Sequence, residues 1–386
     1  MGMSLLTSAT ESVYGEDLEM FRDTLRAFYR REVEPNVKNF EVDGVGHDIW
    51  RKAGAAGLLG TCVPEEYGGA GDKGLSIVIG AEELGYSPAG ASAGAFLGTD
   101  ICTLFLASHG TEEQKQRWFP TIISGDTVQC MGMTEPESGS DAVAIRTTAV
   151  RDGGDYVING SKCFISNGAK ADLLYIIAKT DPAARAKGMS IILVPTGTPG
   201  LTQRRMKTMG YAGGDTGEIF LDNVRVPTAN LLGPEGGALR IFQTQMALDR
   251  MQVCSRSLGA ANQAFEMTLE YVRNRKIFGQ RIIDFQNTQF KLAEIETDLA
   301  IGRAYMDDLV RKYQKGTFDD RDGWRAKIWF PEMEFRTLDT CVQLWGGNGW
   351  MDSNPISRMF TAARVQRIYA GATELQKSLM GRAYIK

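Results

Sequence analysis

The spacing of the apolar residues changes twice along this chain, and few folds accommodate such a change. Over residues 1–126 apolar side chains recur every three or four positions, which is the spacing of amphipathic helices. From Thr127 the period shortens toward that of β-strands, and from Gly236 long helical segments return. We therefore predict an α+β multidomain protein, with an N-terminal all-α domain at residues 1–126, a mostly antiparallel middle β-domain at 127–235 and a C-terminal four-helix bundle at 236–386.

Local signals place individual elements inside these domains. The N-terminal domain is expected to contain helices at 16–40, 48–57, 75–84 and 86–106. Pro35 is expected to bend or end the first of them, and Thr111 begins a capping box. In the β-domain the pair Asn159-Gly160, between two β-rich runs, predicts a hairpin turn. The bundle is expected to contain helices at 238–274, 285–313, 322–345 and 356 to the C-terminus.

The composition argues against several classes of function. Lys and Arg number 43 against 47 Asp and Glu, and the basic residues are dispersed, so no nucleic-acid surface is expected. The six cysteines show no Cys-x-x-Cys pair and there are two histidines, so no metal site is expected. The N-terminal residues lack signal features, and no apolar stretch approaches the roughly 20 residues that span a bilayer. We expect a cytoplasmic protein without membrane contact.

Two segments have the chemistry of a binding site. Near the C-terminus Gln343 is followed by a turn in which Gly346, Gly347 and Gly349 let the backbone approach a bulky group. An ordinary glycine-rich helix connection would explain the same residues. The string MGMTEPESGSDA at 131–142 places hydroxyl groups and free backbone N–H groups at a strand end, where they suit a ring edge or a phosphate.

Four segments taken together resemble the acyl-CoA dehydrogenase family. They are MGMTEPESGSDA (131–142), KCFISNG (162–168), RNRKIFGQRIIDFQNTQFKLAEI (273–295) and CVQLWGGNGWMDSNPISRMFTAARVQRIYAGATELQ (341–376). The match spans essentially the whole chain. It implies FAD as cofactor, acyl-CoA as substrate, electron transfer flavoprotein as electron acceptor, and a homotetramer (a dimer of dimers) in which the third segment reaches the FAD of a neighbouring subunit.

The resemblance also implies roles for individual residues. The FAD contacts that it implies are Met131, Met133, Thr134, Ser140, Phe164, Ser166, Arg275, Phe278, Gln286, Gln343, Gly346, Gly347, Ala372, Thr373 and Glu374. The substrate contacts are Ser140, Asp249, Arg250, Tyr369 and Ala370. Ala372 stands where the family generally has a threonine, so Thr373 is the expected replacement for that contact.

The catalytic base does not occupy the position that is most common in the family. In many members of the family a glutamate follows the tyrosine at the position of Tyr369, and here that position is Ala370. Asp249 lies within an apolar helical stripe, where burial would raise its pKa and make it a better base. It also occupies the position at which isovaleryl-CoA and long-chain acyl-CoA dehydrogenases carry their glutamate. We predict Asp249 as the base and rank Glu374 as its rival.

The exchange of glutamate for aspartate leaves alternatives open. The carboxylate is drawn back by about an ångström, which can cost on the order of 100-fold in rate unless the substrate or the helix shifts. The fold could instead serve enoyl-CoA reduction, β-elimination or oxidation of a carrier-bound acyl chain. A non-catalytic binding protein that keeps the cofactor site is a third possibility. Phe96, Asp100 and Thr103 are expected to approach the floor of the acyl pocket.

Overall fold

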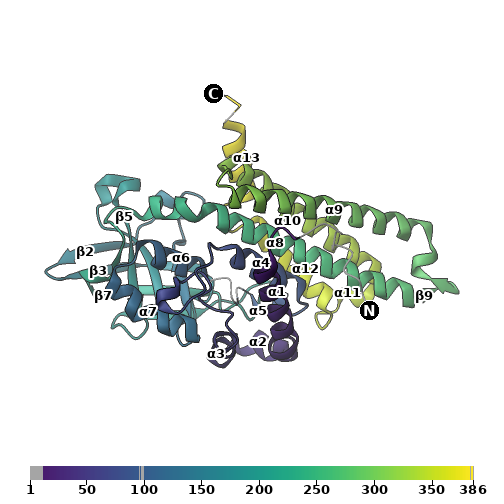
Figure 1. Cartoon of the computed structure of the whole chain (residues 1–386), viewed down its shortest axis with the longest axis horizontal. Coiled ribbons are helices and arrows are strands. Elements are labelled where there is room, and N and C mark those ends of the chain that lie inside the picture. Colours follow the sequence, from purple (N-terminus) through teal and green to yellow (C-terminus); the bar gives the residue numbers. More distant parts are fainter. Residues whose placement is uncertain (1–11, 95, 97–99, 383, 386) are drawn as a thin grey trace.

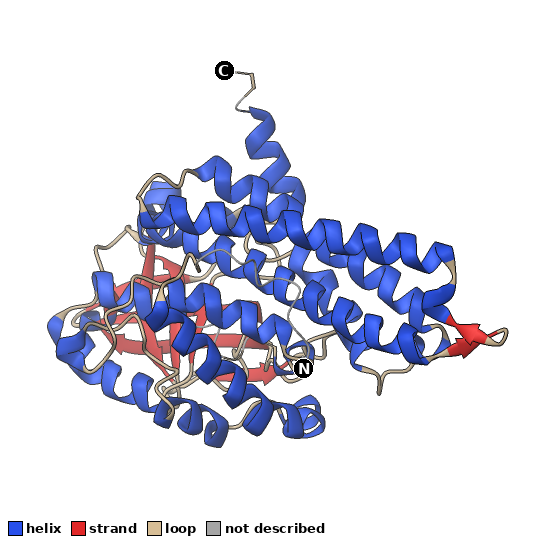
Figure 2. Cartoon of the chain, turned by 45° about the vertical axis from the view of Figure 1, so that its right-hand side comes forward, coloured by secondary structure: helices blue, strands red, loops and turns tan. Residues whose placement is uncertain are grey.

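The computed structural model describes residues 12–94, 96, 100–382 and 384–385, and it contains three parts in chain order. Helices form the first part, a sheet of eight strands the second, and long helices the third. Figure 1 shows the sheet at one end of the long axis and the tips of the long helices at the other. Figure 2 shows that further helices cover the sheet. The predicted order of helices, strands and helices is confirmed.

The first predicted helix is divided into several pieces. α1 (Glu16–Phe28) runs into a π-turn (Tyr29–Val33) and a 3-10 turn (Glu34–Asn36), and α2 (Val37–Asp43) follows. The predicted bend at Pro35 is confirmed, because the proline lies in the 3-10 turn.

The single buried helix predicted over 86–106 is wrong. α4 (Leu75–Tyr86) ends before Pro88, and Ser87 is extended with φ −71° and ψ 131°. A residue that precedes a proline is driven out of the helical region, which explains this end. Two shorter helices take the place of the predicted one, α5 (Gly90–Ala93) and α6 (Asp100–His109).

Two more helices complete the N-terminal part, α3 (His47–Ala55) and α7 (Glu112–Ser124). The side chain of Thr111 accepts a hydrogen bond from the backbone of Gln114, and the side chain of Gln114 accepts one from the backbone of Thr111. The predicted capping box is therefore confirmed.

The strands form one sheet in the order β6-β7-β3-β2-β4-β5-β8, with β1 paired to β4. Their bounds are β1 (Gln129–Gly132), β2 (Thr148–Asp152), β3 (Asp155–Ile165), β4 (Leu173–Lys179), β5 (Met189–Pro195), β6 (Leu201–Arg205), β7 (Gly217–Pro227) and β8 (Leu231–Leu232). The pairing is antiparallel except where β1 and β2 meet β4. The prediction of a mostly antiparallel domain is confirmed.

The hairpin predicted at Asn159-Gly160 is wrong. Both residues lie inside β3, at a register shift against β7, and the turn between β2 and β3 is formed by Gly153 and Gly154 instead. Gly160 lets β3 pass close to the backbone of Thr147, because a Cβ atom there would lie 2.7 Å from the Cα atom of Thr147. The glycine therefore marks an irregularity within a strand rather than the end of one.

The third part consists of long helices that end in shorter ones. They are α8 (Ala238–Asn274), α9 (Gln286–Gln314), α10 (Asp320–Trp345), α11 (Gly347–Trp350), α12 (Pro355–Ala363) and α13 (Thr373–Arg382). A small hairpin, β9 (Lys276–Ile277) with β10 (Gln280–Arg281), joins α8 to α9. The last predicted helix is interrupted after α12 by a 3-10 turn (Arg364–Arg367) and by residues 368–372.

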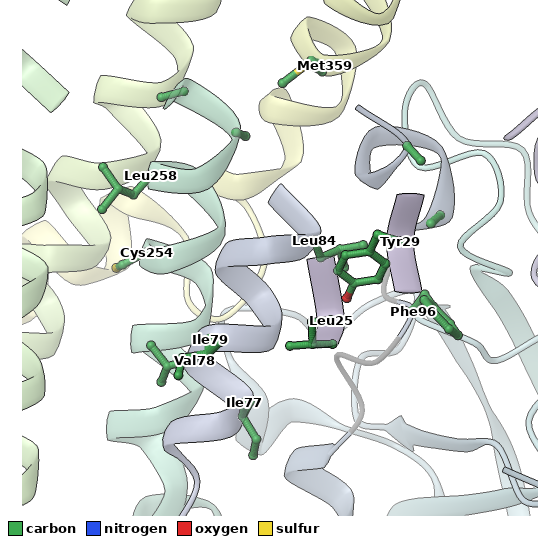
Figure 3. Close-up of a cluster of buried hydrophobic side chains, with 14 of the residues drawn as sticks. Leu25, Tyr29, Ile77, Val78, Ile79, Leu84, Phe96, Cys254, Leu258 and Met359 are labelled. Atoms are coloured by element: carbon green, nitrogen blue, oxygen red, sulfur yellow. The ribbon is translucent and has the colours of Figure 1, made fainter. Parts of the chain in front are cut away.

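The main hydrophobic core lies where the N-terminal helices meet α8. Figure 3 shows α4 in the middle, with Leu25, Tyr29 and Phe96 on one side of it and Cys254 and Leu258 of α8 on the other. The two helices cross closely at a pair of glycines. A Cβ atom on Gly85 of α4 would meet the Arg256 carbonyl oxygen, and one on Gly259 of α8 would meet that of Glu82. This contact fixes α8, which carries Asp249.

Among the described residues, no helix is both long enough and apolar enough to cross a membrane.

Candidate active site

Asp249 lies half-buried on α8. Its Oδ1 atom accepts a hydrogen bond from Nε2 of Gln252, 3.1 Å away. Burial raises the pKa of Asp249, while the hydrogen bond from Gln252 and the charges of Arg250 and Lys327 oppose the shift. A half-buried carboxylate with a raised pKa is suited to accept a proton.

The neighbouring Arg250 does not neutralise Asp249 directly. Its guanidinium is 2% exposed and donates from Nη1 to Oδ1 of Asp320, 3.2 Å away. Gly323 leaves room for it, because a Cβ atom there would lie 2.7 Å from Cδ of Arg250. Adjacent residues on a helix do not face each other, and these two side chains have different partners. Arg250 fastens α8 to the start of α10, and its contact with substrate stays a prediction.

The turn before α13 contains Tyr369 and Ala370. Ala370 has φ +51°, in the left-handed region that a residue with a Cβ atom seldom adopts. No residue that the structure describes accepts the Ala370 N–H, so this donor is available to a ligand. Tyr369 leaves 36% of its surface exposed and donates from its hydroxyl to Oε1 of Gln366.

The other predicted residues of this turn differ in exposure. Thr373 is 2% exposed, and its hydroxyl donates to the Arg367 carbonyl over 3.4 Å. Glu374 is the second residue of α13 and has an exposed side chain, and Ala372 is half-buried. The assignments of Ala372, Thr373 and Glu374 to FAD stay predictions.

The strand-end residues of the predicted FAD site come together at the exits of β1 and β3. The backbone N–H of Cys163 donates to the Thr134 carbonyl, 3.0 Å away, which joins the two motifs. Phe164 is 64% exposed with φ +59°, and Ser166 beside it is also exposed. Met131 and Met133 lie half-buried next to this exit, and Ser140 is exposed in the loop after it. An exposed aromatic ring on strained backbone is typical of a binding surface.

A buried ion pair, which sequence reasoning missed, holds these two motifs together. Nζ of Lys162 lies 2.7 Å from Oε1 of Glu135, and both side chains are almost fully buried. Burial acts to raise the pKa of Glu135, but hydrogen bonds from Lys162 and the backbone keep it below its usual value. Burial lowers the pKa of Lys162 to about 8, which still leaves it charged at neutral pH. The only signal in the sequence was that Glu135 lies in the segment 131–142 and Lys162 in the segment 162–168.

The remaining predicted FAD residues lie at the far end of the long helices. Arg275, Phe278 and Gln286 are exposed on and beside the β9–β10 hairpin. Gln343, Gly346 and Gly347 end α10 and begin α11, close to the same tip of α8. This proximity follows from the stacking of Tyr271 on Trp345, with ring centroids 4.2 Å apart.

The structure therefore divides the predicted FAD residues into two groups. The strand-end group belongs to the sheet, and the tip group belongs to the hairpin and the α10–α11 turn. Figure 1 shows the sheet and β9 at opposite ends of the molecule. A single chain does not bring the two groups together.

Two residues predicted near the floor of the acyl pocket are buried, and their place at the pocket stays a prediction. Phe96 is 1% exposed, and its ring packs against Trp50 with centroids 4.9 Å apart. Thr103 is fully buried, and its Oγ1 accepts a hydrogen bond from Gln129. The side chain of Asp100 lies outside the described residues.

A subunit of helical, sheet and helical domains in this order defines a class of three-domain proteins. Comparison of the sequence with family models identifies the family. Family models of the N-terminal, middle and C-terminal domains of acyl-CoA dehydrogenases match residues 15–126, 130–224 and 236–385. The chain belongs to the acyl-CoA dehydrogenase family.

Individual relatives match nearly the whole chain. The mitochondrial long-chain specific acyl-CoA dehydrogenase of Rattus norvegicus is 36% identical over 377 residues, which are 97% of this chain and 87% of that protein. Acryloyl-CoA reductase (NADH) of Anaerotignum propionicum is 34% identical over 372 residues, 95% of this chain and 94% of that protein. The crystal structure of acyl-CoA dehydrogenase from Geobacillus kaustophilus superposes with a TM-score of 0.91 at 37% identity, covering 96% of this chain and 98% of that one.

Proposed function

We propose that the protein is an FAD-dependent acyl-CoA dehydrogenase that desaturates an acyl-CoA thioester between Cα and Cβ, with Asp249 as the base. The observation that carries this proposal is the half-buried Asp249 on α8, whose pKa is raised by burial. Bound FAD supplies the acceptor for the hydride that leaves Cβ.

The chain's own residues would hold the thioester and remove the proton. The free N–H of Ala370 would donate to the thioester oxygen, which stabilises the negative charge that develops there. The carboxylate of Asp249 would then take the proton from Cα. Ser140 would contact both cofactor and substrate from its exposed loop.

The residues present suit FAD, provided that a second copy of the chain completes the site. At the tip group a Cβ atom on Gly346 or Gly347 would meet nothing within 4 Å, so another molecule can approach the backbone there. Phe278 is 95% exposed and Trp350 85% exposed at the same tip. Apolar rings exposed to this degree indicate a surface covered by another molecule. We propose a homotetramer in which this tip covers the adenosine diphosphate half of a neighbour's FAD.

Anaerobic mixing with a panel of CoA thioesters tests the proposed reaction. We expect at least one saturated acyl-CoA to bleach the visible absorbance of the bound flavin, with the matching enoyl-CoA as product. Electron transfer flavoprotein is the proposed acceptor that restores the colour. A yellow protein that no acyl-CoA bleaches would contradict the proposal.

Replacing Arg275 with Gln tests the role of the hairpin. The guanidinium of Arg275 is exposed and forms no ion pair with the residues that the structure describes, so it is available to a pyrophosphate group. We expect R275Q to purify with less FAD per subunit, while the circular dichroism spectrum is unchanged. Arg281→Gln is the matched control, because Arg281 on the same hairpin is engaged by Asp284 at 2.7 Å. Equal flavin content in both variants would remove Arg275 from the cofactor site.

A second reaction of the same site is favoured by one comparison. A relative with 34% identity is named acryloyl-CoA reductase (NADH). In addition, this chain carries Asp249 at the position where, by the resemblance, isovaleryl-CoA and long-chain acyl-CoA dehydrogenases carry a glutamate. The site could therefore work in the reducing direction, or catalyse β-elimination or act on a carrier-bound acyl chain. Bleaching by a saturated acyl-CoA would favour dehydrogenation, and product without bleaching would favour a non-redox reaction.

A further inference from the structure

A second polar side chain, Arg256, follows Asp249 on α8. It lies seven residues further along, which is two helical turns and about 10 Å on nearly the same face. Nη2 of Arg256 donates to the carbonyl oxygens of Gly90 and Gly94, at 3.1 and 2.6 Å. Its guanidinium carbon lies 4.2 Å from the centre of the Tyr211 ring. Arg256 therefore holds the ring of Tyr211 in place.

A chain of hydrogen bonds connects Tyr211 to the active-site turn. Nε2 of Gln366 donates to the Tyr211 hydroxyl oxygen over 3.0 Å, and Oε1 of Gln366 accepts from the Tyr369 hydroxyl. Nζ of Lys327 donates to the Gln366 carbonyl over 2.6 Å. Gln366 is fully buried, so these bonds fix the positions of both tyrosines. The ring of Tyr211 is itself half-buried.

The hydroxyl proton of Tyr211 has no acceptor among the residues that the structure describes. The Tyr211 oxygen already accepts from Gln366, and no described residue accepts its O–H. Burial raises the pKa of Tyr211 to about 12, so the hydroxyl keeps its proton at neutral pH. A phenol that is held on two sides and has a spare O–H is a preorganised donor.

A neutral ligand group fits this cluster better than an anion. The cationic groups near it already hold hydrogen bonds: Nη2 of Arg256 with two carbonyl oxygens, Nζ of Lys327 with the carbonyl of Gln366, and Nη2 of Arg367 with Glu332 at 2.5 Å. Glu334 contributes no charge, because burial raises its pKa to about 8. The donor that this cluster leaves for a ligand is therefore the uncharged Tyr211 hydroxyl, which suits a neutral oxygen.

We propose that the acyl group handled by this enzyme carries a neutral oxygen, a hydroxyl or a carbonyl, on the part of the chain remote from the thioester, and that Tyr211 donates a hydrogen bond to it. This inference rests on the proposed function and specifies its substrate class. Arg256, which lies against the Tyr211 ring, is about two helical turns from Asp249, so an oxygen at Tyr211 would lie well beyond Cα and Cβ. The acyl chain itself would run from Asp249 toward Tyr211.

Matched pairs of acyl-CoAs test the inference. Straight-chain acyl-CoAs of several lengths are compared with the same compounds bearing a distal hydroxyl or carbonyl group, and with compounds that end in a carboxylate. We expect kcat/KM for the best neutral oxygenated compound to exceed that of its plain counterpart by about tenfold, the effect of one well-placed hydrogen bond. In Tyr211→Phe, which keeps the ring on Arg256, the ratio should fall toward one.

The control variant is Tyr67→Phe, which removes an exposed hydroxyl bonded to Glu112. It should keep the wild-type ratio. The inference is overturned if plain chains or carboxylate-ended chains are preferred, or if Tyr211→Phe leaves the ratio unchanged. Bleaching by plain chains without any preference would overturn this inference alone, whereas no bleaching by any compound would also overturn the proposed function.

Discussion

Replacing Asp249 with Asn is expected to slow flavin bleaching by acyl-CoA by about 100- to 10,000-fold, the usual contribution of a positioned general base. Asparagine preserves the shape of the side chain and its contact with Gln252, so the protein should still bind FAD and stay yellow. The measurement is anaerobic stopped-flow absorbance with the best acyl-CoA of the panel.

Proton exchange separates the role of this base from an effect on binding. Wild-type protein should exchange the α-proton of bound acyl-CoA with solvent deuterium, and D249N should not. Because burial raises the pKa of Asp249, the acid limb of the wild-type pH–rate profile should lie above the pKa of an ordinary aspartate, and D249N should lack that limb. Asp249→Glu, which keeps a carboxylate, should keep exchange.

The matched control for this experiment is Glu374→Gln, which removes the rival carboxylate from the first turn of α13. We expect nearly wild-type exchange per bound FAD from this variant, because the Glu374 side chain is exposed. Exchange that survives in D249N but disappears in Glu374→Gln would move the catalytic role to Glu374.

The parts of this molecule that depend on local sequence could be predicted. The bounds expected for the longest helix, 238–274, agree with α8, because an uninterrupted helical period is a strong signal. The burial that raises the pKa of Asp249 also followed from its place in an apolar helical stripe. Both depend on residues close together in the chain.

The parts that depend on distant contacts could not be predicted. Asn159-Gly160 carries a strong hairpin signal, but the packing of Gly160 on Thr147 places the pair inside β3. Tyr211 comes from a loop that follows β6, and its partners Arg256 and Gln366 come from two other elements. No periodicity in the sequence relates such residues, so their association emerges only from the tertiary fold.

Replacing Lys162 with Met is expected to destabilise the β-domain by about 3–5 kcal/mol. The substitution leaves the Glu135 carboxylate buried without its cation, and an unpaired buried charge is costly. Because Lys162 lies on β3 beside Phe164 and joins this strand to the exit of β1, the loss should spread to the strand-end group. We expect faster amide hydrogen exchange in β1 and β3, and a lower FAD content.

A double variant distinguishes the unpaired charge from the lost packing of the lysine chain. Adding Glu135→Gln to Lys162→Met removes the buried charge, so a substantial part of the stability should return. Arg225→Met on β7 is the matched control, since its ion pair with Asp152 is half-exposed and should contribute about 1 kcal/mol or less. If the double variant is no more stable than Lys162→Met alone, the ion pair is not what joins the two motifs.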